Sequence, residues 1–373
     1  MPPLTWLEID QAALRNNVRR MAALTGTRVM AVVKANAYGH GAAGVAQAAA
    51  EAGAAWLAVA RADEGLALRA AGLTAPILVL GYTPPEAAAE ALAHALTLTV
   101  VDEAGGQACA AAGRAMGQPA RVHLKVDTGM GRLGVLPADA PALYRALRAL
   151  DGLAVEGVFT HFARADERLD PADPSSAPAQ LARFEAVLAA LPERPRWVHA
   201  ANSAAAFTLP GARFDAVRMG IALYGLHPSA ETPCPPEFQP ALTWKARVTQ
   251  VKHLPAGQGI SYGHYYVTRA PETVAALAVG YADGYRRALH LNEVLLHGRR
   301  APVRGRVCMD QIIVGVSHLP EVRPGDEAVL LGRQAAASGE LAALSADELA
   351  EKWQTINYDV TSGILGRVPR RYR

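Results

Sequence analysis

Chemically reactive side chains follow several short apolar runs of the sequence. They are Lys34, Lys125 with Arg132, His161, Asn202 with Ser203, and Arg218. A lysine in an apolar pocket loses its proton readily, and its amine then condenses with an aldehyde. Ser203 and the backbone N–H groups around Gly220 and Ile221 are suited to hold a phosphate, and Tyr38 adds a hydroxyl donor. With Arg218 as partner for a ring nitrogen, the set predicts pyridoxal 5'-phosphate as cofactor.

Each of these residues alone is more often structural. A lysine after a buried strand usually reaches the surface, and a lone histidine such as His161 usually makes an ordinary hydrogen bond. An arginine after a strand usually pairs with a nearby carboxylate. Five such groups at strand ends favour function, because structural residues have no reason to gather on one rim.

Eight short apolar or β-branched runs, each followed by helical spacing, predict the strands that position these side chains. Continuous apolar runs that alternate with helices are typical of parallel strands buried on both faces. Eight units favour an α/β fold of the (β/α)8 barrel type over a doubly wound open sheet, which shares the same local signals. Barrel active sites lie at the carboxyl ends of the strands. The predicted strands are Val29–Val33, Trp56–Ala60, Ile77–Leu80, Leu98–Val101, Val122–Val126, Val155–Thr160, Trp197–Ala200 and Ala216–Met219.

The sequence changes character after His227. Five prolines between residues 228 and 240 favour a linker, because proline fits neither helix interiors nor central strands. We therefore expect a barrel domain over residues 1–235 and a mainly β domain over 236–373, with the first ~10 residues able to pack with the second domain. Strands are predicted at Ala246–Lys252, Thr273–Val279, Ile312–Val316 and Glu327–Leu331, and a helix capped by Ser345 runs to Trp353.

Composition narrows the choice of function. Lys plus Arg number 37 and Asp plus Glu 34, a formal charge of +3 without a basic run, so no nucleic-acid partner is expected. The opening MPPLTWLEID lacks the pattern of a secretory signal, and no apolar stretch is long enough to span a membrane. The expected location is the cytoplasm. Cys109, Cys234 and Cys308 are far apart with no CxxC, so neither a disulfide framework nor a metal site is expected.

Taken in order, the motifs resemble those of the alanine racemase family over essentially the whole chain. One such motif is a weak signal, whereas many in register across both domains are a strong one. The matching segments are Ala31–Gly41, Lys125–Gly134, Thr160–Asp166, His199–Ala205, Arg218–Gly225, Ile260–Tyr266, Val279–Tyr285, Gly305–Gln311 and Ile356–Val360.

The resemblance implies a role for each matching residue. Lys34 attaches the cofactor and is one acid/base; Tyr262 is the other, supplied by the second subunit of a homodimer. Arg132 and the backbone of Met309 bind the substrate carboxylate, and Lys125 is the position that carries a carbamate in many members. The cofactor-binding set is Lys34, Tyr38, His161, Asn202, Ser203, Arg218, Gly220, Ile221 and Tyr358. Supporting residues are Tyr281, Cys308 and Asp310, and a polar access corridor matches Asp166, His199, Arg287 and Arg306, with Tyr281 and Tyr358 at its inner end.

The implied activity is two-base racemisation of L- and D-alanine, which supplies D-alanine for peptidoglycan. A tyrosine base has an ordinary pKa of about 10, so Tyr262 needs positive neighbours or donors, which His161 backed by Arg218 could supply. Arginine keeps its proton, so Arg218 would leave a ring nitrogen uncharged. A related decarboxylase would carry an acidic residue there. The remaining alternatives are a racemase of serine or of several small amino acids and a non-enzymatic cofactor carrier, against which the second domain argues.

Overall fold

The computed structural model describes residues 2–167, 170, 172–288 and 292–373, and its internal contacts divide these into two units. The barrel unit comprises residues 13–37 and 42–239, and the β unit comprises residues 1–12, 38–41 and 240–373. The division falls at Pro240 rather than at residue 236, and the amino-terminal residues group with the β unit. The short segment of residues 38–41 also groups with the β unit, which the sequence pattern did not indicate.

The barrel unit is built around eight parallel strands in the order β8-β7-β6-β5-β4-β3-β2-β9. Backbone bonds from Asp215 N–H to Val198 O (3.0 Å) and from Arg218 N–H to Ala201 O (2.9 Å) join the two ends of this order. The expected (β/α)8 fold is thereby confirmed. The strands are β2 (Arg28–Val32), β3 (Trp56–Val59), β4 (Ile77–Val79), β5 (Leu96–Val100), β6 (Ala120–Lys125), β7 (Leu153–Phe159), β8 (Trp197–His199) and β9 (Ala216–Met219).

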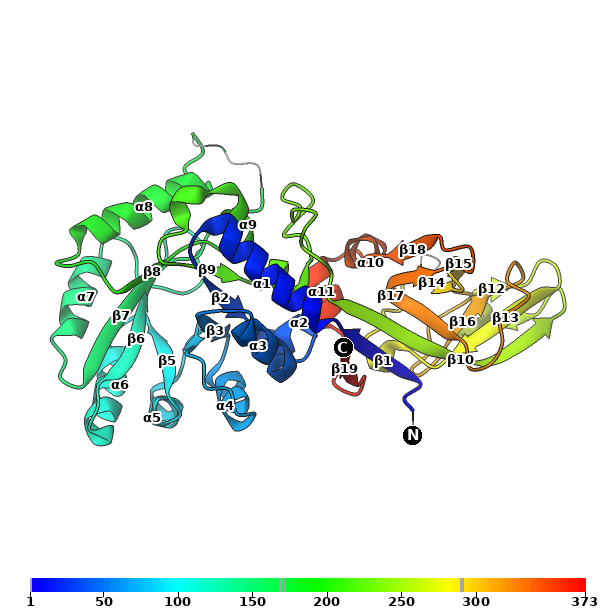
Figure 1. The fold of residues 1–373 in the computed structure, drawn as a ribbon, viewed down its shortest axis with the longest axis horizontal. Coiled ribbons are helices and arrows are strands. Elements are labelled where there is room, and N and C mark those ends of the chain that lie inside the picture. Colours follow the sequence, from blue (N-terminus) through cyan, green and yellow to red (C-terminus); the bar gives the residue numbers. More distant parts are fainter. Residues whose placement is uncertain (1, 168–169, 171, 289–291) are drawn as a thin grey trace. The chain divides into compact units, whose positions relative to one another are not determined.

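Helices α3 to α8 lie around the outside of these strands (Figure 1). Local sequence signals set their ends: the Asp102 carboxylate accepts the Gly105 N–H at 2.7 Å to cap α6, which ends at left-handed Gly117. The helical elements are α1 (Gln11–Thr25), α2 (Lys34–Tyr38), α3 (Ala42–Glu51), α4 (Ala62–Ala70), α5 (Pro85–Ala93), α6 (Glu103–Met116), α7 (Ala140–Arg148), α8 (Ala177–Ala190), α9 (Ser203–Thr208) and the 3-10 turns η1 (Pro210–Ala212) and η2 (Ile221–Tyr224). No helix in the described part of the chain is long and apolar enough to cross a membrane.

The β unit is organised on one long strand, β10 (Leu242–Leu254), which pairs antiparallel with β1, β13 and β17. Its first half alternates buried and half-buried residues, as expected where one face packs on a core. The remaining strands are β1 (Thr5–Ile9), β11 (Gly259–Ile260), β12 (Tyr266–Val267), β13 (Glu272–Leu277), β14 (Glu293–Leu296), β15 (Arg299–Pro302), β16 (Ile312–Gly315), β17 (Glu327–Ala335), β18 (Leu341–Leu344) and β19 (Arg370–Tyr372). Its helical elements are η3 (Tyr262–His264), η4 (Tyr281–Asp283), α10 (Ala346–Trp353) and α11 (Asn357–Ser362).

Candidate active site

Lys34 lies just beyond β2, at the start of an unusual left-handed turn. Ala35, Asn36 and Ala37 have φ of 52–54°, a conformation that costs free energy for residues with a Cβ. Glu64 holds the turn, because its carboxylate accepts the N–H of Ala35 at 2.6 Å and of Ala60 at 2.8 Å. The sequence did not indicate Glu64, since nothing local ties it to Ala35, 29 positions earlier.

The amine of Lys34 loses its proton more readily than the amine of an ordinary lysine. Burial is the first cause that lowers its pKa, and the nearby cations Arg132 and Arg218 lower it further. Glu64 opposes them. A neutral amine is the form that acts as a nucleophile or accepts a proton.

Lys125, the last residue of β6, is a buried lysine surrounded by cations. It is 5% exposed, and its Nζ lies 5.8 Å from the centre of the Phe159 ring. Burial, followed by Arg132 and Arg218, lowers the pKa of Lys125 to about 8. No ion pair of Lys125 with a carboxylate occurs within the described residues. Asp127, the nearest acid in sequence, accepts four backbone N–H groups of residues 129–132.

Arg218, in β9, is buried with four of its five N–H groups directed into the barrel. Nη1 donates to His199 at Nδ1 (2.9 Å) and at the carbonyl (3.0 Å). Nη2 donates to the carbonyls of Thr160 and Ala200, both at 2.7 Å, and to His161 Nδ1 at 3.2 Å. Burial lowers the pKa of Arg218 to about 9, so the guanidinium stays charged at neutral pH. Its Nε–H has no acceptor in the described part of the chain and is left for a ligand.

The two histidines bonded to Arg218 are neutral. Burial, and then the charge of Arg218, holds the pKa of both His161 and His199 well below the ordinary value. His161 can therefore offer an N–H donor but not the positive charge that the sequence analysis also considered. His199 is 0% exposed and stacks on Phe159 at 4.7 Å, so it does not line the solvent-accessible corridor that the resemblance assigned to it.

Ser203 and the start of η2 form a group of unfilled donors. The Ser203 hydroxyl accepts the N–H of Gly220 at 2.9 Å and of Ala222 at 3.3 Å, while Asn202 caps α9 by accepting the Ala205 N–H at 2.9 Å. Within the described residues, the backbone N–H groups of Ser203 and Ile221 have no acceptor. Converging free N–H groups and a hydroxyl are what binds a phosphate. The N–H of Gly220 is not available to a ligand, because it donates to the Ser203 hydroxyl. This bond instead positions the donors around Ser203.

The β unit carries Tyr262 and Met309 beside one cavity of about 590 Å³. The cavity is lined by two segments, residues 261–264 and 308–311. Ser261 joins them, because its hydroxyl donates to the Arg306 carbonyl at 2.7 Å and lies 3.3 Å from Cys308 Sγ. Tyr262 is 67% exposed. In the described chain the N–H of Met309 has no acceptor, which leaves it able to bind an anion.

Tyr281 lies against the loop that holds Met309. The N–H of Tyr281 donates to the Cys308 carbonyl and that of Ala282 to the Met309 carbonyl, both at 3.0 Å. Gly280 allows this approach, because a Cβ there would lie 2.2 Å from the Met309 oxygen. These backbone bonds place Tyr281 next to Met309.

The remaining expected residues fall in several places. Tyr38 and Tyr358 meet in the β unit with ring centres 6.0 Å apart, and burial raises the pKa of Tyr38, which keeps its hydroxyl a donor. Arg306 lies over the Tyr265 ring at 3.5 Å, and Arg287 is exposed. Asp310 pairs with Arg367 at 2.7 Å, while Asp166 in the barrel unit is half-buried. Among the described residues, no cluster of histidine, cysteine and acidic side chains could hold a metal ion.

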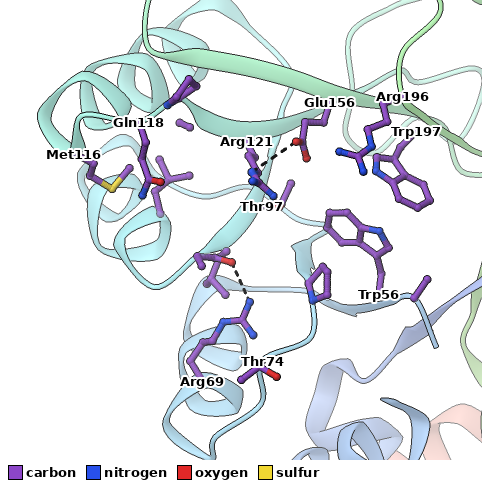
Figure 2. Close-up of a pocket in the computed structure, with 17 residues that line it drawn as sticks. Trp56, Arg69, Thr74, Thr97, Met116, Gln118, Arg121, Glu156, Arg196 and Trp197 are labelled. Atoms are coloured by element: carbon purple, nitrogen blue, oxygen red, sulfur yellow. Dashed lines mark hydrogen bonds and ion pairs between the residues drawn. The ribbon is translucent and has the colours of Figure 1, made fainter. Parts of the chain in front are cut away.

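A second cavity, in the barrel unit, lies at the amino ends of its strands. It has a volume of about 450 Å³ and is lined by the first residues of several strands, among them Leu96. Trp56 and Trp197, also first residues of strands, line it as well (Figure 2). Lys34, Lys125 and Ser203 instead lie at or just after the carboxyl ends of strands. This cavity is smaller than the one beside Tyr262 and Met309 and opens at the opposite end of the strands from the candidate cofactor-binding residues of the barrel unit.

Comparison with known proteins agrees with this geometry. The family described as alanine racemase, N-terminal domain, matches residues 9–228, and the corresponding C-terminal domain matches residues 241–372. An alanine racemase of Symbiobacterium thermophilum is 51% identical over 99% of this chain and 97% of its own length, and one of Desulfovibrio desulfuricans is 45% identical over 98% and 97%. The crystal structure of alanine racemase from Streptomyces lavendulae superposes with a TM-score of 0.91 at 42% identity, covering 100% of this chain and 98% of that one. The chain belongs to the alanine racemase family.

Proposed function

We propose that this protein interconverts L- and D-alanine with pyridoxal 5'-phosphate as cofactor. The observation that carries the proposal is the grouping in the barrel unit of an activated Lys34 with Arg218, whose Nε–H is left without an acceptor in the described chain. The donor set near Ser203 supplies the third requirement, a place for a phosphate. A supply of D-alanine for peptidoglycan is part of the proposal and rests on the family resemblance.

The residues present fit this cofactor. Lys34 would attach it, and the N–H groups of Ser203 and Ile221 with the Ser203 hydroxyl would hold its phosphate. Arg218 would face the ring nitrogen through Nε. Tyr38 and Tyr358 would add hydroxyl donors. When bound, the cofactor supplies a conjugated ring that takes up the electrons left on the substrate Cα.

The chain's own residues would then move one proton. The neutral amine of Lys34 takes it from, or returns it to, one face of the substrate, and Tyr262 serves the other face. The Arg132 guanidinium, which has no ion pair within the described residues, and the Met309 N–H bind the carboxylate. Because arginine does not transfer its proton, Arg218 leaves the ring nitrogen uncharged, which disfavours protonation at the wrong carbon and hence transamination.

A homodimer completes the proposal, with the partner subunit's Tyr262 acting beside Lys34. Exposed apolar side chains of the β unit support an interface. Tyr262, Tyr265, Val267 and Met309 are 67%, 52%, 46% and 52% exposed, and they come from two neighbouring segments. Exposed apolar patches of this kind mark association surfaces on soluble domains.

Incubation of L-alanine in heavy water tests the function directly. We expect deuterium at Cα and formation of D-alanine, both dependent on bound pyridoxal 5'-phosphate. A cofactor carrier would show neither, and a decarboxylase would release carbon dioxide. Serine in place of alanine separates a strict alanine racemase from a broader one.

Tyr281 is expected to limit the size of the substrate side chain. A pocket discriminates one small group by only about 1–3 kcal/mol, so the unmodified protein should racemise serine slowly, whereas packed walls reject leucine far more strongly. Tyr281→Ala should admit leucine and lower alanine turnover. Racemisation rates for a panel of L-amino acids check this, with Tyr82→Ala, at an exposed tyrosine of the barrel unit, as control. Leucine turnover equal to alanine turnover in the unmodified protein would refute the assignment.

Lys125 is expected to carry a carbamate. The pKa of about 8 means that at pH 7 roughly a tenth of the amine is neutral, far more than for an ordinary lysine, and only the neutral amine adds carbon dioxide. The anionic product would relieve a site crowded by Arg132 and Arg218 and would orient Arg132. With ¹³C-bicarbonate, a protein-bound carbonyl signal should increase from pH 6 to pH 8.

Matched lysine variants decide whether that signal belongs to Lys125. Lys125→Gln should lose it and raise the KM for alanine, whereas Lys252→Gln, at an exposed lysine of β10, should retain it. A signal that survives in Lys125→Gln would contradict the prediction.

A further inference from the structure

His123 is a buried histidine of β6 that faces the inside of the barrel and has no role in the proposed chemistry. It is 0% exposed. Two local features make room for its ring. The pairing of β6 with β7 shifts register between Val122 and His123, and a Cβ at Gly157 would lie 2.7 Å from the His123 ring atoms. Register irregularities and strand glycines with a close neighbour recur next to functional sites.

The hydrogen bonds of this histidine have a fixed direction. Arg218 has only donors, so His199 Nδ1 must accept from it. His199 is neutral, and its hydrogen therefore lies on Nε2, which donates to His123 Nδ1 at 3.0 Å. Burial lowers the pKa of His123 to about 3, so this ring is also neutral and carries its hydrogen on Nε2.

The chain of hydrogen bonds ends at His123. Its Nε2 is buried and has no hydrogen-bond partner in the described structure, and its ring lies 5.5 Å from that of Trp56. Trp56 also lines the cavity at the amino ends of the strands (Figure 2). An unpaired buried donor costs stability, so the presence of one here calls for an explanation.

We propose that His123 is a positioning residue that holds Arg218 in the orientation needed to meet a ring nitrogen. It acts through His199, by accepting the Nε2 hydrogen and so fixing the tautomer that leaves Nδ1 free to accept from Arg218. Without this acceptor, His199 can adopt the other tautomer, whose Nδ1 hydrogen would oppose the Arg218 donor. The link to the cofactor rests on the proposed function; the link to the tautomer does not.

Two variants separate hydrogen bonding from packing. His123→Phe keeps a ring but has no acceptor, whereas His123→Asn places Oδ1 near the position of Nδ1. In ¹⁵N-histidine spectra of the protein without cofactor, we expect His199 to be protonated at Nε2 in the unmodified protein and in His123→Asn, and to become mixed in His123→Phe. Thr99→Val, which removes another buried barrel hydrogen bond, is the control and should leave His199 unchanged.

Affinity for pyridoxal 5'-phosphate is the second measurement. The loss of one net hydrogen bond predicts roughly fivefold to tenfold weaker binding by His123→Phe, with affinity restored in His123→Asn. If His123→Phe fails to fold, Gly157→Ala, which displaces the ring, replaces it in both measurements. The proposal is overturned if His199 is protonated at Nδ1, or if His123→Asn behaves like His123→Phe. Failure of the unmodified protein to bind the cofactor would refute the proposed function instead, while the spectra still decide the role of His123.

Discussion

Lys34→Ala is expected to abolish covalent attachment of the cofactor and racemisation of both enantiomers. Loss of a positioned base is typically worth roughly 10²–10⁴-fold in rate, and here the attachment point is lost as well, so the decrease should exceed that range. The unmodified protein should be yellow, and borohydride treatment should fix the cofactor to the peptide that contains Lys34. Peptide mapping by mass spectrometry checks the position.

Lys125 supplies the internal comparison for this experiment. It is the other lysine whose pKa is lowered in the same part of the barrel, and Arg218 acts on both amines. What distinguishes Lys34 is its less complete burial and its place on the turn held by Glu64. Cofactor recovered on Lys125, or attachment retained in Lys34→Ala, would show that the assignment is wrong.

The barrel could be predicted because its signals are local. All eight predicted strands occur, with ends displaced by at most two residues, because each is a continuous apolar run followed by a helix. The strand β1 was missed. Its TWLEI segment is short, and it is a strand because it pairs with β10, with Thr5 opposite Ala246. A partner some 240 residues away leaves no trace in local periodicity.

The same distinction between local signals and long-range contacts applies to the site residues. The positions of Lys34 and Arg218 at strand ends were predictable, and strand ends are where barrel chemistry is expected. Glu64 and His123 were not predictable, since their contacts with the N–H of Ala35 and the ring of His199 exist only in the folded chain. The corridor assignment of His199 failed for the opposite reason, because a motif match carries no information on burial.

Tyr262→Phe is expected to separate the two directions of the reaction. The variant loses only the hydroxyl, so binding and the Lys34 side of the substrate are preserved. Exchange of the α-proton of L-alanine with heavy water should decrease by roughly 10²–10⁴-fold, whereas D-alanine should still exchange through Lys34. Net racemisation in both directions should disappear, because each direction requires both bases. Nuclear magnetic resonance of the two enantiomers, followed separately, measures these rates.

Tyr265→Phe is the matched control. It removes a hydroxyl three residues after Tyr262, from a ring that lies under Arg306. It should leave both exchange rates unchanged, which excludes a general effect of losing a tyrosine hydroxyl from this segment. If Tyr262→Phe still exchanges the α-proton of D-alanine but no longer forms D-alanine, two separate groups must carry the proton in the unmodified protein. Equal loss of exchange from both enantiomers in Tyr262→Phe would instead require a single base that reaches both faces, and the division of labour between Lys34 and Tyr262 would have to be abandoned.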